Sequence, residues 1–130
     1  MSFDVFVCRF ENGEAAALDL SVAHEVLGPF VVARDPELGF LQVRTAEGEE
    51  AGVYFTGPGD ITFNRFGGHG VMELLAVLLH RLDAVLVIPG GPTVIRRDAD
   101  RELLPLSLRR EWPVVVARSG TEIDQAIRGS

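Results

Sequence analysis

Residues 83–92 read Asp-Ala-Val-Leu-Val-Ile-Pro-Gly-Gly-Pro, and this stretch decides the fold. Five consecutive apolar residues, three of them β-branched, are closed by a Pro-Gly-Gly-Pro turn. An apolar run of this length without a polar interruption is typical of a strand that is buried on both faces. We therefore place residues 84–88 centrally in a β-sheet.

The most regular helical pattern in the chain directly precedes this strand. Between residues 71 and 82 the apolar side chains recur at three- and four-residue intervals, at Val71, Leu74, Leu75, Leu78, Leu79 and Leu82. This spacing predicts an amphipathic helix that packs against the sheet. A second helix is predicted over about Leu20–Leu27, with Asp19 or Ser21 as its N-cap.

The remaining strands are predicted from apolar runs between turn signals, at residues 3–10, 40–44, 52–55, 61–65 and 114–117. Short connections make the middle three of these an antiparallel meander. Residues 96–110 are expected to be a loop with a short helical turn, and Ser119 or Thr121 caps a last helix. The prediction is an α+β fold in a single domain, residues 1–130. It is a single mostly antiparallel sheet of about six strands, with two main helices on one face and a short C-terminal helix.

The charge balance favours some partners and disfavours others. The 130 residues contain 19 Asp and Glu against 12 basic residues, all of them arginine, which gives a net charge of −7. Such a chain repels nucleic acid at long range and would favour a basic protein partner. The absence of lysine, with abundant Ala, Val, Gly and Leu, is typical of GC-rich bacterial coding.

The sequence gives no sign of a membrane or secretory location. No apolar run approaches the roughly 18 residues of a membrane span, and the N-terminus lacks a basic segment followed by an apolar core. Cys8 is the only cysteine and cannot form an internal disulfide. We therefore expect a cytoplasmic protein that does not bind membranes.

No set of residues with catalytic or metal-ligand spacing is found. Cys8 lies mid-strand among aromatic residues, where a cysteine usually acts as a small apolar side chain. His24, His69 and His80 form no His-x-x-x-His pair, and there is no Cys-x-x-Cys, so neither a zinc site nor a cofactor is expected. Arginines between residues 96 and 110 alternate with carboxylates, which favours ion pairing on a solvated surface.

Two functional hypotheses follow, and a third remains open. The first is a non-catalytic binding protein whose acidic surface masks a basic partner; that surface comprises Glu47, Glu49, Glu50 and Asp60. The alternative is a small enzyme or ligand-binding domain with its site at the glycine-rich turn, formed by Asn64, Arg65 and His69. A homodimer that forms through an unprotected strand edge is the third.

Two resemblances accompany these hypotheses. The Asp83–Gly91 stretch, with Asp19-Leu20-Ser21 and Glu25-Val26-Leu27, is similar to the DJ-1/PfpI superfamily. That resemblance implies a flavodoxin-like sheet and a nucleophilic cysteine near residues 117–119. This segment reads Ala-Arg-Ser and contains no cysteine, so we interpret the likeness as local.

The second resemblance covers nearly the whole chain. It is carried by Phe3–Val7, Phe63-Asn64-Arg65, Pro89–Pro92 and the closing Arg118-Ser119-Gly120. These segments resemble a group of short, acidic, lysine-poor, uncharacterised actinobacterial proteins. In size and charge this group is similar to the immunity proteins of polymorphic-toxin systems, which implies protein binding and no catalytic residues.

Overall fold

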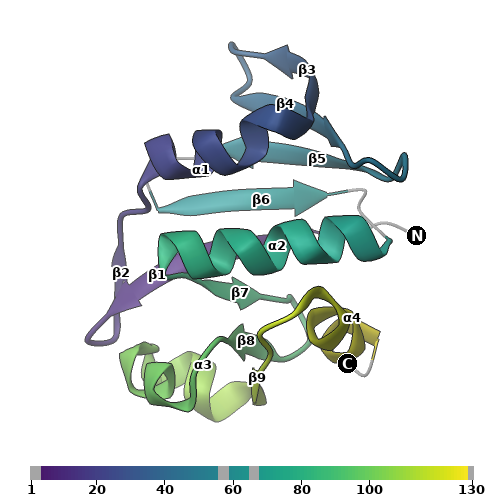
Figure 1. The fold of residues 1–130 in the computed structure, drawn as a ribbon. Coiled ribbons are helices and arrows are strands. Elements are labelled where there is room, and N and C mark those ends of the chain that lie inside the picture. The colour runs from purple at the N-terminus through teal and green to yellow at the C-terminus, as the bar shows by residue number, and fades with distance from the viewer. Residues whose placement is uncertain (1–3, 56–58, 65–67, 129–130) are drawn as a thin grey trace.

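The computed structural model describes residues 4–55, 59–64 and 68–128, and it is an α+β fold with one mixed sheet (Figure 1). The strands are β1 (Val5–Glu11), β2 (Glu14–Ala16), β3 (Val31–Asp35), β4 (Phe40–Arg44), β5 (Glu50–Phe55), β6 (Asp60–Asn64), β7 (Val85–Val87), β8 (Thr93–Ile95) and β9 (Val114–Val116). The helices are α1 (Leu20–Leu27), α2 (His69–Leu82), α3 (Leu106–Glu111) and α4 (Gly120–Arg128), with 3-10 turns η1 (Gly28–Phe30) and η2 (Asp98–Leu103).

Strand β1 lies in the interior of the sheet. The order is β3-β4-β5-β6-β1-β7-β8-β9, and β2 forms a hairpin with the end of β1. Every described neighbour pair is antiparallel except β8 and β9, which run parallel. The apolar stretch that anchors the prediction forms β7 between β1 and β8, and the predicted meander β4-β5-β6 is confirmed.

The predicted sheet size of about six strands is wrong, because the sheet contains nine. The three additional strands are β2, β3 and β8, and two of them span only three residues. Residues 31–35 read Val-Val-Ala-Arg-Asp and lack the apolar alternation of a half-buried strand. These segments become strands because a neighbouring strand supplies hydrogen-bond partners, and local propensity does not report that pairing.

Helices cover one face of the sheet. Figure 1 shows α1 and α2 in front of the strands, and the main core joins their apolar residues to β1, β5, β6 and β7. Leu75 and Leu78 of α2 are fully buried, as are Val5, Val7 and Phe63 from the sheet. α4 packs against α2 and buries Ile123. None of the described helices is both long and apolar enough for a membrane span.

The helix ends follow from identifiable side chains. Asp19 is the N-cap of α1, because one of its carboxylate oxygens accepts hydrogen bonds from the backbone N–H groups of Ser21 and Val22. The Ser21 hydroxyl donates a further hydrogen bond of 2.6 Å to the same oxygen, and this bond together with the one from the Val22 N–H lowers the pKa of Asp19. α2 ends at Asp83, which adopts a left-handed backbone conformation (φ 54°).

Candidate functional site

A row of side chains, apolar except for the buried Thr62, crosses the face of the sheet opposite α2. The strand registers align one residue from each strand, in the order Phe40, Tyr54, Thr62, Phe6 and Val87. Residues on either side of these positions along each strand, such as Val7 and Phe63, point into the helix-covered core. We call this row, with the neighbouring side chains Gln42, Glu50, Asn64, Cys8 and Asp60 on the same face, the open face.

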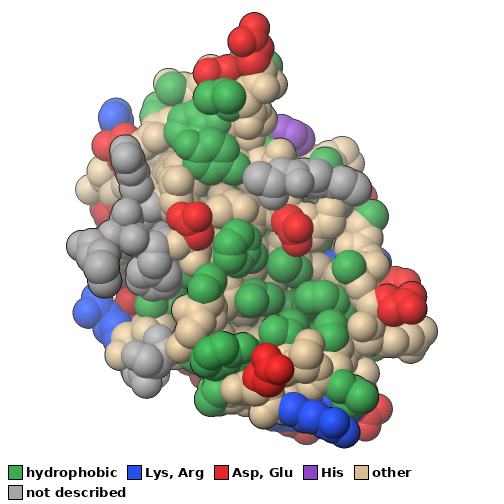
Figure 2. Space-filling view, turned by 180° about the vertical axis from the view of Figure 1, so that it is seen from behind, with side chains coloured by type: hydrophobic (Ala, Val, Ile, Leu, Met, Phe, Trp, Pro, Cys, Tyr) green, Lys and Arg blue, Asp and Glu red, His purple; other side chains and the backbone are tan. Residues whose placement is uncertain are grey.

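The open face is less covered than the helical side. Phe6, Phe40 and Tyr54 are only partly buried, and the rings of Phe40 and Tyr54 lie 4.8 Å apart, tilted by 46°. Figure 2, which views the molecule from behind, shows hydrophobic side chains gathered in the middle, with carboxylates around them. The described residues packed on this side are at the β7–β8 end, where Leu104 contacts Val85 and Ile95.

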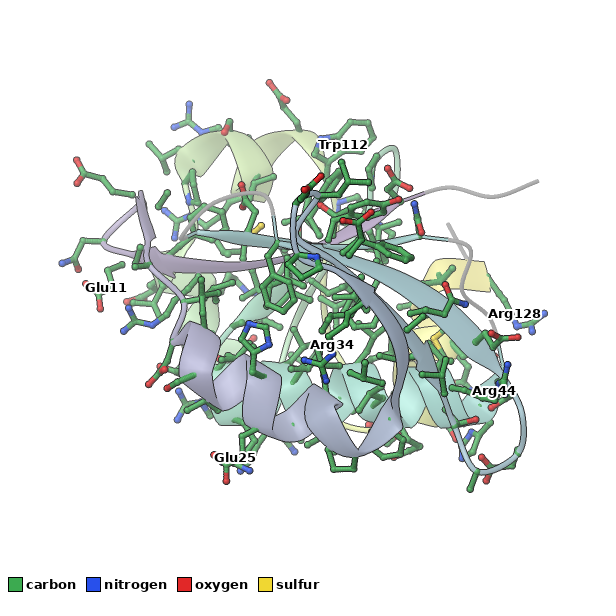
Figure 3. All side chains as sticks on the ribbon, turned by 90° about the horizontal axis from the view of Figure 1, so that it is seen from above. Glu11, Glu25, Arg34, Arg44, Trp112 and Arg128 are labelled. Atoms are coloured by element: carbon green, nitrogen blue, oxygen red, sulfur yellow. The ribbon has the colours of Figure 1, made fainter. Side chains whose placement is uncertain are left out.

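The two sides of the sheet therefore carry different elements. In Figure 3, Trp112 lies on the side opposite α1 and α2, whereas Glu25 projects outward from α1. Trp112 is 41% exposed, although tryptophan is usually well buried. The side opposite the helices thus presents aromatic surface both in the row and beyond its end.

Cys8 and Asp60 lie directly opposite each other on the open face. Cys8 of β1 and Asp60 of β6 are register partners, and the thiol donates a hydrogen bond to the Asp60 carboxylate at 3.2 Å. Burial, the hydrogen bond to Asp60 and the negative charge of Asp60 together raise the pKa of Cys8 to about 12. A thiol that stays protonated at neutral pH is a poor nucleophile.

Glu50 lies at the far corner of the same face. Its carboxylate accepts hydrogen bonds from Gln42 Nε2 at 3.0 Å and from an Arg44 guanidinium nitrogen at 3.5 Å. Both partners are neighbours on β4, and all three side chains are exposed or partly so. Glu50 and Asp60 are near opposite ends of the strands, so the open face has carboxylates at both ends of its apolar row.

Glu49 has a structural role that the sequence did not predict. Its Oε1 accepts a hydrogen bond of 2.7 Å from the backbone N–H of Gly70, in the first turn of α2. The residue before that helix, Gly68, has φ +91°, and a Cβ there would collide with the Glu49 carboxylate. Glu49 therefore caps α2 from a distance of 21 residues, because the β4–β5 turn packs on the helix N-terminus.

Glu47 also lies near the N-terminus of α2. It belongs to the same turn and is exposed, and its carboxylate lies beside Gly70. The four acidic residues predicted as one binding surface are thus divided among three places. Glu47 and Glu49 lie at the N-terminus of α2, whereas Glu50 and Asp60 occupy separate ends of the open face.

Of the residues of the alternative site, the structure describes His69 and Asn64. His69 is the first residue of α2, its side chain is 68% exposed, and its Nε2 is 3.7 Å from a Glu73 carboxylate oxygen. That same Glu73 oxygen accepts a hydrogen bond from the Gly120 N–H at 2.8 Å and so caps α4. Asn64 lies across from Gly52 on the open face, and Arg65 is outside the described residues. A groove of about 320 Å³ between α1 and α2 begins at Gly70, but His69 does not line it.

Comparison with protein-family models, with curated proteins and with solved structures finds no match for this chain. Within the described residues, no group of three or more His, Cys, Asp or Glu side chains is arranged to hold a metal ion. The functional argument therefore depends on the surface of the chain itself.

The aromatic residues of the open face were not among the predicted site residues. One signal in the sequence could have identified them, because the first strand has apolar residues on both faces, with Phe6 and Cys8 alternating with Val5 and Val7. That pattern was interpreted as burial on both sides. The structure covers the Val5 side with α2, while Phe6 remains partly exposed.

Proposed function

We propose that the chain is a non-catalytic binding protein whose open face docks on a basic protein, in the manner of an immunity-type inhibitor. The observation that carries the proposal is the apolar row from Phe40 to Val87 on the side of the sheet that α1 and α2 leave uncovered. An antiparallel sheet with helices on one side normally presents polar residues on the other. Here that side presents Phe6, Tyr54 and Phe40 to solvent.

The composition of this surface matches that of protein interfaces. Aromatic residues are enriched at the centres of interfaces, and a polar rim surrounds them. Contiguous exposed apolar surface that is rimmed by polar groups marks interaction sites on soluble proteins. The row supplies the apolar centre, while Gln42, Glu50, Asn64 and Asp60 supply the polar rim.

Charge decides between a basic partner and a second copy of the chain. The net charge is −7, and Asp60 and Glu50 border the row, with the charge of Glu50 partly offset by Arg44. Two copies meeting through this face would bring like charges together, which costs binding energy, whereas a basic surface would be attracted and would associate faster. The proposal is therefore a heterologous complex with a basic protein.

The test uses the protein as bait against the separately expressed products of the genes adjacent to its own. Isothermal titration should identify one basic product that binds, and its affinity should fall as salt is raised. Tyr54→Ser should weaken binding at least about tenfold, because it removes an aromatic ring from the interface centre. Asp60→Arg should slow association.

The matched control is Val77→Ser, which removes an exposed apolar side chain (46% exposed) from α2 on the other side of the molecule. This variant should bind like the parent protein. The proposal fails if no adjacent product binds, or if all three variants bind equally well. It also fails if sedimentation shows that the open face forms a homodimer.

A further inference from the structure

A second, independent site lies at the ends of the two parallel strands. β8 and β9 run side by side, and each is followed within two residues by an arginine, Arg96 after β8 and Arg118 after β9. Between them and α2 is a pocket of about 320 Å³. Its lining residues are Ala76, Leu79, His80, Arg96, Arg97, Ala117 and Arg118. Three cations and an imidazole thus line the pocket, and no carboxylate does.

Arg96 is held rigidly at the base of this group. Its side chain is 12% exposed and donates hydrogen bonds to His80 Nδ1 at 3.1 Å and to the Asp83 carboxylate. Its Nε is buried and has no hydrogen-bond partner among the described residues. This nitrogen is too deeply buried for a ligand to reach, but the guanidinium charge at the base of the pocket favours an anion there.

Arg96 also orients the His80 ring. Arginine carries only donors, so His80 Nδ1 is the acceptor in this contact. His80 lines the pocket and is exposed. The ring therefore adds a polar group to the pocket beside the guanidinium groups.

Arg118 is oriented by the backbone. Its Nε donates a 2.9 Å hydrogen bond to the carbonyl of Arg96, which ties the side chain to the end of the neighbouring strand. Neither terminal nitrogen of Arg118 has a hydrogen-bond partner in the described part of the chain. The paired terminal N–H groups of a guanidinium match the geometry of a carboxylate or phosphate.

Arg97 is the third arginine of the pocket, and carboxylates that do not line the pocket partly offset its charge. Arg97 donates to Asp100 at 3.0 Å and to Asp83 at 3.5 Å, and Asp100 is 5% exposed. Asp83 and Asp100 therefore offset two of the three positive charges without lining the pocket. The alternating charges of residues 96–110 predicted ion pairs such as Arg97–Asp100, but on a solvated surface, whereas Asp100 is buried. The pattern did not predict the pairing with Asp83 or that Arg118 would join from another strand.

We propose that this pocket binds a small organic oxyanion, with the arginines holding the charged group and the apolar residues holding its carbon skeleton. Arg118 and Arg96 provide the donors, while Ala76, Leu79 and Ala117 provide an apolar wall. Ligands commonly bind beyond the carboxyl ends of parallel strands, where the chain leaves the sheet and side chains converge. The site is separate from the open face and does not depend on the proposed partner.

The experiment measures binding of four probes by isothermal titration and by amide chemical-shift changes. The probes are phenyl phosphate, benzoate, inorganic phosphate and benzyl alcohol. At least one of the two aromatic oxyanions should bind more tightly than inorganic phosphate, and benzyl alcohol should not bind. Whichever of phenyl phosphate and benzoate binds better identifies a phosphate ester or a carboxylate as the ligand class.

Two variants complete the test. Arg118→Gln should weaken binding of the better probe about tenfold, because it removes an exposed charged donor without disturbing the core. The matched control is Arg101→Gln, because Arg101 lies close in sequence, pairs with Asp98 and does not line the pocket. It should leave binding within about twofold. Absence of oxyanion binding, or equal loss in both variants, would overturn the proposal.

Discussion

The two faces of the sheet differ although they are built from the same strands. In β1, Val5 and Val7 have no exposed surface, whereas the intervening Phe6 is partly exposed although it is larger. On β6, Phe63 is fully buried under the helices, while Asp60 on the other side is exposed. The helix-covered face is closed by α1, α2 and α4, and the open face has described cover only near β7 and β8.

The two faces should therefore have different roles: one stabilises the fold and the other is available to bind a partner. Fully buried apolar side chains contribute most to folding, because each is removed completely from water. Partly exposed aromatic side chains contribute less to folding and retain surface that a partner can bury. Substitutions on the two faces should therefore affect two different measurements.

The largest effect is expected on the helix-covered face. Phe63→Ala removes a fully buried ring and leaves a cavity between β6 and the helices. The free energy of unfolding, measured by urea denaturation, should fall by about 3–5 kcal/mol. A loss below about 1 kcal/mol would show that this face is not the main core.

An intermediate effect is expected where the β4–β5 turn meets α2. Glu49→Gln weakens the hydrogen bond from Gly70 and removes a negative charge from the helix N-terminus. The free energy of unfolding should fall by about 1–2 kcal/mol. The control Glu37→Gln changes an exposed glutamate in the β3–β4 turn and should stay within about 0.5 kcal/mol of the parent.

A smaller effect on stability is expected on the open face. Phe6→Ala removes a ring that is only partly buried, so the free energy of unfolding should fall by about 1 kcal/mol. Urea denaturation of this variant alongside Phe63→Ala compares the two faces directly. If the two losses are equal, the open face is a second core and the distinction between the faces is wrong.

The last effect is absent at neutral pH and appears only at alkaline pH. The pKa of Cys8 is raised to about 12 in the folded chain, whereas an unfolded thiol titrates near about 8.5. The unfolded state therefore loses its proton first, so the stabilisation is complete below about pH 8 and is lost as the pH rises toward 12. Replacing Cys8 with alanine should flatten the fall in stability between pH 8 and 11. An unchanged slope would contradict the raised pKa.

Much of the fold was predictable because it depends on local patterns. The helix at residues 20–27, the strand at residues 40–44 and the meander were all confirmed. The short strand β8 was missed, because three residues between Pro92 and Arg96 carry too little pattern and become a strand only by pairing. The capping role of Glu49 was missed for the same reason, since its partner Gly70 is 21 residues away.

The site was less predictable than the fold. Glu47, Glu49, Glu50 and Asp60 were grouped because all four are acidic, but their positions depend on how the turns dock. Apolar residues on both sides of a strand do not say whether both sides are covered. Phe6 and Tyr54 are distinguished from core residues only by the position of the helices.

The most direct test of the account is hydroxyl-radical footprinting of the chain with and without the basic protein that we propose as its partner. We expect oxidation of Phe6, Phe40 and Tyr54 to fall when the partner is added, because the complex buries the apolar row. His69, which is exposed at the start of α2, should remain equally reactive. Protection of His69 with unchanged oxidation of the three aromatic residues would contradict the assignment of the open face as the binding surface.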